Sequence, residues 1–87
     1  MVFDLSSARE QIDMIDDELA KLMAQRFAIT DEIGRYKKVR GLSVRNPERE
    51  RAVINRAVAV TGEDLRNEVT EIFSLLMQLA RGREEEI

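Results

Sequence analysis

The chain has no cysteine and no histidine, and only one proline and four glycines among its 87 residues. Without cysteine there is no disulfide framework, no thiolate nucleophile and no zinc–thiolate site. Without histidine, serine–histidine–aspartate triads, imidazole acid–base catalysis and histidine-ligated metal sites are excluded. Any chemistry in this chain must therefore rely on charged and amide side chains.

Long hydrophobic runs are also missing, and none approaches the roughly 20 residues of a membrane-spanning helix. The first residues lack the basic flank and apolar stretch of a signal peptide. Hydrophobic residues still make up 44% of the chain, too large a share for a disordered segment. We expect a soluble, cytoplasmic protein with a single small domain over residues 1–87.

A long first helix is predicted by apolar residues that recur with a heptad rhythm through the first 36 positions. Ser7 and Glu10 form a capping-box motif that marks a helix start. We expect this helix to run from about residue 6 to about residue 39 and to end near Gly41.

Two shorter helices follow. Asn46 is a favoured N-cap and Pro47 a favoured first helical residue, so a second helix is expected to extend to about Val60 and to end at Gly62. A third is expected to begin near Asp64. Since no stretch alternates like a strand, the predicted class is all-α, with one long and two shorter helices.

The predicted first helix is long for so short a chain. About 33 residues at 1.5 Å each give about 50 Å, whereas a compact chain of this length has a radius of gyration of about 12 Å. We expect an intertwined homodimer in which two long helices pack together. A monomeric hairpin, with the two shorter helices end to end along the first, is the alternative.

Several ionisable residues fall on the core-facing edges of the predicted helices. Arg26 takes an apolar position of the heptad row, and Lys37, eleven residues later, projects from nearly the same face. Their side chains could hold a small anion between them. The alternatives are that Arg26 pairs with Glu50, that Lys37 is solvated, that Glu84 belongs to a solvated acidic tail and that Arg9 is an ordinary surface residue.

Basic residues are concentrated between positions 35 and 51, although the net charge is −3. A local basic patch on an acidic chain favours a small anion over a polyanion surface. A non-catalytic module for helical dimerisation or nucleic-acid binding remains an alternative.

Three segments of the sequence resemble the small all-helical chorismate mutases. They are A-R-E-Q-I-D-M-I-D-D-E-L from Ala8, Q-R-F-A-I-T-D-E-I-G-R-Y-K from Gln25 and V-R-N-P-E-R-E-R from Val44. The resemblance covers about residues 5 to 84. It implies an intertwined homodimer of three-helix chains and an isomerase that converts chorismate to prephenate in phenylalanine and tyrosine biosynthesis.

The resemblance also implies roles for particular residues. Arg9 matches an arginine donated by the partner chain, and Arg26 matches one that binds a substrate carboxylate. Lys37 matches the lysine that contacts a carboxylate and the breaking ether oxygen, while Arg49 and Glu50 match a pair whose glutamate accepts from the substrate hydroxyl. The implied catalytic residues are Lys37, Glu84 and Arg26, and the implied binding residues are Arg9, Arg26, Lys37, Asn46, Arg49, Glu50, Ala80 and Glu84.

Four positions depart from the family pattern. Asn46 replaces a frequent aspartate near the ring hydroxyl, Ala80 a serine near a carboxylate, Glu84 a glutamine that donates to the ether oxygen, and Arg81 an apolar residue. Two related activities therefore stay open: a 4-amino-4-deoxychorismate mutase and an isochorismate–pyruvate lyase. None of these reactions leads us to expect a metal or a cofactor, and we expect the dicarboxylate substrate and a second copy of the chain as partners, with no nucleic acid and no membrane.

Overall fold

The computed structural model describes residues 2–87 and contains three α-helices and one short 3₁₀ turn over that range. Helix α1 spans Leu5–Arg40, α2 spans Pro47–Thr61 and α3 spans Arg66–Glu86, with the 3₁₀ turn η1 at Glu63–Leu65. No strand occurs in this part of the chain. The predicted all-α class, with one long and two shorter helices, is confirmed.

Local signals explain where most helices start and stop. Asn46 caps α2, accepting a hydrogen bond from the Arg49 N–H, and Pro47 is the first helical residue. Gly41 ends α1 in the left-handed conformation, with φ of 67°, a geometry that glycine adopts without steric cost. Gly62, with φ of 97°, ends α2.

Helix α1 begins at Leu5, next to the predicted start, but its N-cap differs from the prediction. Asp4, not Ser7, is the N-cap, because its carboxylate accepts hydrogen bonds from the backbone N–H groups of Ser6 and Ser7. A carboxylate at this end also complements the helix dipole, so the capping-box interpretation of Ser7 and Glu10 is wrong. The start of the third helix is also corrected: η1 covers Asp64, and α3 begins at Arg66.

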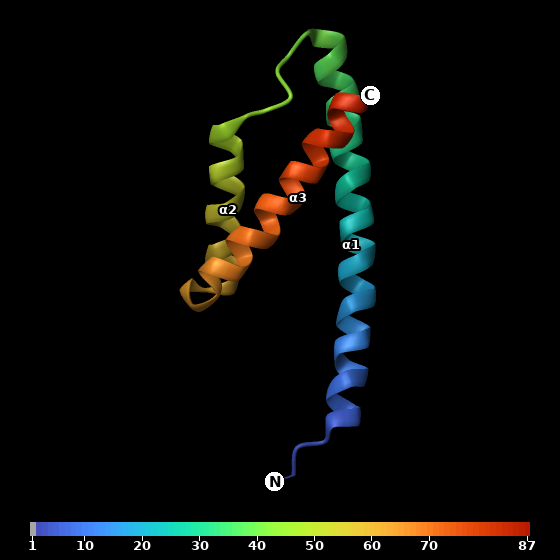
Figure 1. Ribbon diagram of the computed structural model, residues 1–87, viewed down its shortest axis with the longest axis vertical. Helices are drawn as coiled ribbons and strands as arrows, with labels where there is room; N and C mark the ends of the chain where they lie inside the picture. Colours follow the sequence, from blue (N-terminus) through green and yellow to red (C-terminus); the bar gives the residue numbers. More distant parts are fainter. Residues whose placement is uncertain (1) are drawn as a thin grey trace.

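Helix α3 packs against both other helices, whereas α1 and α2 do not pack on each other within residues 2–87. In Figure 1, α3 crosses obliquely from the lower end of α2 to the upper part of α1. A small core between α2 and α3 holds Ala57, Val58 and Val69, with Ile54 and Phe73 against them. The predicted alternative, in which the two shorter helices lie end to end along the first, is therefore not the arrangement found.

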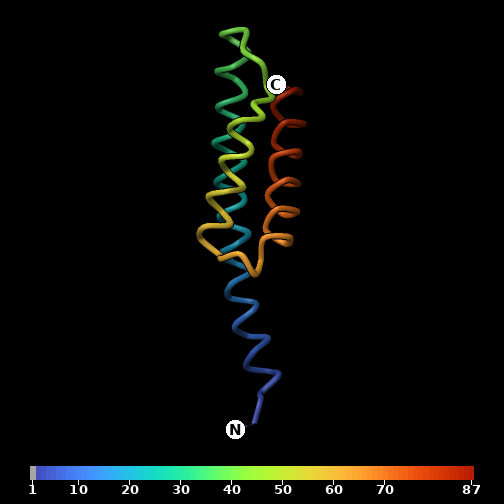
Figure 2. The backbone as a smooth tube through the Cα atoms, turned by 90° about the vertical axis from the view of Figure 1, so that its left-hand side faces the viewer, coloured from blue at the N-terminus to red at the C-terminus, as the bar shows by residue number. Residues whose placement is uncertain are grey.

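The N-terminal end of α1 extends beyond the other helices, as Figures 1 and 2 both show. The chain measures 59 × 25 × 15 Å, with a radius of gyration of 16.5 Å, well above the roughly 12 Å of a compact chain of this length. Large apolar side chains along the N-terminal half of α1 are exposed, Leu19 by 51% and Leu22 by 57%. No helix among the described residues has the length and apolarity needed to cross a membrane.

Candidate functional site

A cavity of about 260 Å³ lies where the second half of α1, the start of α2 and the end of α3 meet. It contains all the candidate binding residues except Arg9. Its lining residues are Arg26, Thr30, Ile33, Lys37, Val44, Asn46, Arg49, Glu50, Val53, Met77, Ala80, Arg81 and Glu84. Three separate helices thus bring charged side chains to one open cavity.

Arg26 lies on the α1 wall of this cavity. Its Nη1 atom is buried and has no hydrogen-bond partner among residues 2–87. Glu50, the partner that the sequence offered as an alternative, forms its ion pairs with Arg81 and Arg45 instead. The predicted Arg26–Glu50 salt bridge is therefore wrong, and Arg26 carries an uncompensated donor, which is costly when buried.

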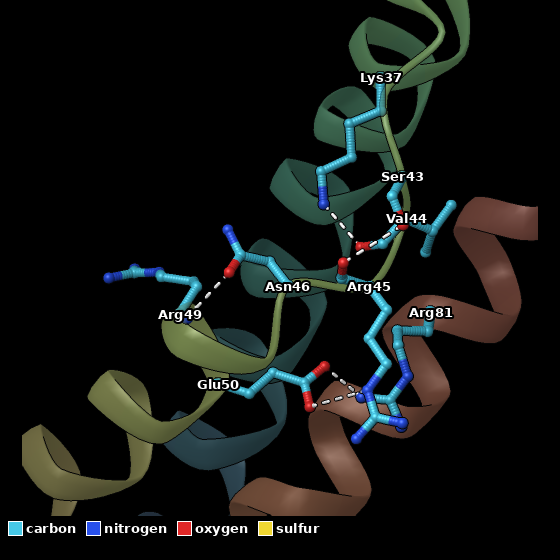
Figure 3. Close-up of polar contacts among 8 residues, drawn as sticks. All are labelled: Lys37, Ser43, Val44, Arg45, Asn46, Arg49, Glu50 and Arg81. Carbon is cyan, nitrogen blue, oxygen red and sulfur yellow. Dashed lines mark hydrogen bonds and ion pairs between the residues drawn. The ribbon is translucent and has the colours of Figure 1, made fainter.

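Lys37 lies about three turns beyond Arg26 on the same helix. Because Gly41 adopts the left-handed conformation, the N–H of Leu42 reaches back to the Lys37 carbonyl at 2.8 Å and the chain reverses. The returning loop places the Val44 carbonyl 2.7 Å from Lys37 Nζ (Figure 3). The solvated-lysine interpretation is wrong, since Lys37 is half-buried and hydrogen-bonded; its ammonium group retains two further donors.

The first turn of α2 directs the charged side chains of Arg49 and Glu50, neighbours in sequence, to different sides. The Asn46 side-chain oxygen accepts from the Arg49 N–H at 3.1 Å, which fixes the start of the helix. In Figure 3 the Glu50 carboxylate points toward α3, whereas the Arg49 guanidinium points away from it. The Asn46 oxygen is thus engaged in capping, and its amide nitrogen remains available as a donor.

Glu50 is bound by two arginines from different parts of the chain. Arg81 Nη1 on α3 donates to Oε2 of Glu50, and Arg45 Nε in the loop lies 4.0 Å from Oε1 (Figure 3). The Glu50 and Arg81 side chains are only 20% and 25% exposed. This ion pair ties the end of α3 to the start of α2 across the cavity.

Glu84 is buried on the last turns of α3, with 8% of its surface exposed. Its interpretation as part of a solvated acidic tail is therefore wrong. Burial raises the pKa of its carboxyl; Lys37 and Arg81 lower this pKa, while Asp31 and Glu85 raise it. The net direction is upward, so the neutral acid is more populated than for an exposed glutamate.

Gly34 makes the burial of Glu84 possible. A Cβ atom added to Gly34 would lie 2.8 Å from Cγ and 3.1 Å from Cα of Glu84. Only a residue without a side chain lets the α3 backbone approach α1 this closely. A lone glycine inside a helical pattern signals such an approach, but the sequence does not say which residue lies opposite.

A second ion pair between helices joins α3 to α1 near Gly34 and Glu84. Arg83 donates to both carboxylate oxygens of Asp31, at 3.0 and 2.7 Å, and its guanidinium lies 5.7 Å from the Phe27 ring centre. The Arg83 hydrogen bonds hold the pKa of Asp31 below its usual value. Since Arg83 directly precedes Glu84, this pair joins α3 to α1 one residue away from Glu84.

The remaining candidates contribute differently. Ala80 is buried in the cavity wall and offers no side-chain hydrogen bond. Arg9 is exposed on the protruding part of α1, 17 residues before Arg26 and hence about 25 Å away along the helix. Within a single chain, Arg9 does not reach the cavity.

We predict that Gly34→Ala destabilises the protein by about 1–3 kcal/mol, because the new methyl group forces α3 away from α1. Gly82→Ala is the matched control, since no atom of the described residues 2–87 lies within 4 Å of a Cβ there. It should stabilise the helix by about 0.5–1 kcal/mol. Urea denaturation measures both; equal stabilisation by the two variants would show that the close approach at Gly34 is absent.

Comparison with known proteins adds an independent observation. The sequence profile of a family described as "Chorismate mutase type II" matches residues 8–85 of the chain. This match covers most of α1, all of α2, most of α3 and the whole cavity lining.

Individual relatives show partial matches. The chain is 32% identical to a "Chorismate mutase" of Methanocaldococcus jannaschii over 56 residues, 64% of this chain and 57% of that protein. It is 39% identical to a "T-protein" of Enterobacter agglomerans over 54 residues, 62% of this chain and 14% of the relative. It is 32% identical to a "Bifunctional chorismate mutase/prephenate dehydratase" of Aquifex aeolicus over 60 residues, 69% of this chain and 17% of the relative. The matched segments thus span 57% or less of these relatives' lengths.

Proposed function

Because the chain belongs to the chorismate mutase type II family, we propose that it catalyses the rearrangement of chorismate to prephenate. The observation that carries this proposal is the cavity in which Arg26, Lys37 and a buried Glu84 meet. Its cationic lining suits a small dicarboxylate, and a rearrangement within one molecule needs neither a nucleophile nor a proton relay.

The cations would first select the reactive shape of the substrate. Chorismate carries two carboxylates, one on the ring and one on the enolpyruvyl arm, and it reacts when the arm folds over the ring. The unpaired Arg26 donor offers a charge-assisted hydrogen bond to one carboxylate. Holding both anionic groups in a chair-like conformer supplies the orientation that the reaction requires.

Lys37 and Glu84 would then act on the ether oxygen. As the carbon–oxygen bond breaks and a carbon–carbon bond forms, negative charge grows on that oxygen. Donors aimed there bind the transition state more tightly than the ground state. Lys37 has donors beyond its bond to Val44, and Glu84 can donate when it is protonated, which its raised pKa favours.

We also propose that the active unit is an intertwined homodimer. Apolar residues along the N-terminal half of α1 are exposed in the single chain, among them Ile12, Ile15, Leu19 and Leu22. A second copy that buries this stripe would bring its own Arg9 to the cavity. Such a donated arginine would add a third positive group beside Arg26 and Lys37.

The first test of the activity is a chorismate-depletion assay with product identification. We expect the wild type to form prephenate and Lys37→Ala to lose at least about 100-fold in kcat, because one transition-state donor is removed. Lys38→Ala is the matched control, since Lys38 is exposed and outside the cavity lining. Pyruvate with salicylate, or turnover of the 4-amino analogue alone, would instead identify one of the related activities.

The role of Glu84 predicts a pH dependence. Only the protonated carboxyl can donate to the ether oxygen, and its pKa is raised by burial, so kcat should increase as the pH falls from 8 to 5. Glu84→Gln, which donates at every pH, should flatten this profile. A wild-type rate that stays constant or declines over this range, with the fold intact, contradicts the role.

The shared site predicts complementation between two inactive variants. Arg9→Ala and Arg26→Ala chains, once mixed and allowed to exchange, form heterodimers in which one site keeps both arginines. Statistical mixing should restore roughly a quarter of wild-type activity. Mass spectrometry verifies that the subunits have exchanged. If activity does not recover after that exchange, Arg9 does not act across subunits.

A further inference from the structure

The Glu50 carboxylate is a hydrogen-bond acceptor whose charge is already compensated. Arg81 donates to one of its oxygens, and Arg45 Nε lies 4.0 Å from the other. An ionised carboxylate has about four lone-pair positions, so these two arginines leave acceptor capacity for a ligand. Because Glu50 lines the cavity, it can accept a hydrogen bond there without presenting a net negative charge.

Of the two arginines, Arg81 dominates this compensation. It lines the cavity, makes direct contact with Glu50, and is 25% exposed. The Arg45 side chain is 64% exposed and lies farther away, so solvent screens its charge. Asn46, the neighbouring polar residue on this side of the cavity, is neutral and does not change the net charge around Glu50.

We propose that Arg81 is a specificity-determining residue that makes this end of the cavity accept a neutral hydroxyl group and reject a cationic ammonium group. The inference rests on the proposed function. Chorismate and 4-amino-4-deoxychorismate differ in this substituent: the first has a ring hydroxyl where the second has an amine. An aliphatic amine is largely protonated near neutral pH.

The remaining charged side chains of the cavity also disfavour an ammonium group. Arg26 and Lys37 both line it and are positive, and they repel an ammonium group while attracting the carboxylates that both substrates share. Burial raises the pKa of the Glu84 carboxyl, so its charged form is less populated than that of an exposed glutamate. Glu50 is the cavity carboxylate that Arg81 contacts, and Arg81 offsets the attraction that Glu50 would exert on an ammonium group.

The experiment measures kcat/KM for both substrates in the full chain. We expect the wild type to prefer chorismate and Arg81→Met to narrow that preference by about tenfold or more, the effect of exposing one charge to the ligand. Arg81→Gln, which also removes the charge, should narrow it similarly. Arg81→Lys keeps the charge and should stay near the wild-type ratio.

Arg56→Met serves as the control for loss of one positive charge, since Arg56 is exposed on α2 and outside the cavity lining. It should leave the ratio unchanged. A purely structural role of Arg81 would lower both substrates' kcat/KM equally and would not move their ratio.

The inference is overturned if both charge-removing variants keep the wild-type ratio, or if Arg56→Met narrows it as much as they do. Either result, with chorismate turned over by the wild type, leaves the proposed function standing. A wild type that converts neither substrate overturns the proposed function and this inference with it.

Discussion

A buried guanidinium N–H group is costly without an acceptor, and the cavity of this protein contains such a group. Arg26 is half-buried as a residue, but its Nη1 atom is buried and has no hydrogen-bond partner among residues 2–87, and the two acidic residues nearby do not supply one. Glu50 is held by Arg81 on the opposite wall, and burial drives Glu84 toward its neutral form. The cavity therefore keeps an excess of positive charge, and we propose that a ligand anion pairs with it. The proposed chemistry follows, because the same charges that bind a dicarboxylate also stabilise the negative charge formed as its ether bond breaks.

One helix connects this site to the rest of the molecule. The second half of α1 carries Arg26, Gly34 and Lys37, and its first half carries the exposed apolar stripe and Arg9. If a second chain covers the stripe, folding and completion of the site become one event. The length of α1, which one chain alone cannot bury, is then a functional feature. It delivers Arg9 to the cavity of the partner chain.

The sequence predicts most of the fold because its signals are local. Asn46–Pro47, Gly41 and Gly62 mark helix ends through the conformation of a few residues, and the structure has ends at or next to each of them. The N-cap of α1 was mispredicted because Asp4 and Ser7 are both good caps, and the choice depends on geometry over the whole first turn. The candidate residues around the cavity came from spacing and family resemblance. The contacts among them, such as Arg81 with Glu50, depend on how α3 is rotated against α2, and no local pattern encodes that rotation.

The most direct test of the central claim is a calorimetric titration with a bicyclic ether dicarboxylate shaped like the chair-like transition state, compared with its monomethyl ester. The cavity should bind one dicarboxylate per chain, and the monoester should bind at least about 100-fold more weakly, because it leaves one cation of the cavity without an anionic partner. Arg26→Met should remove most of this difference. Equal affinity of the wild type for the dicarboxylate and the monoester would contradict the claim that paired positive charges define the site.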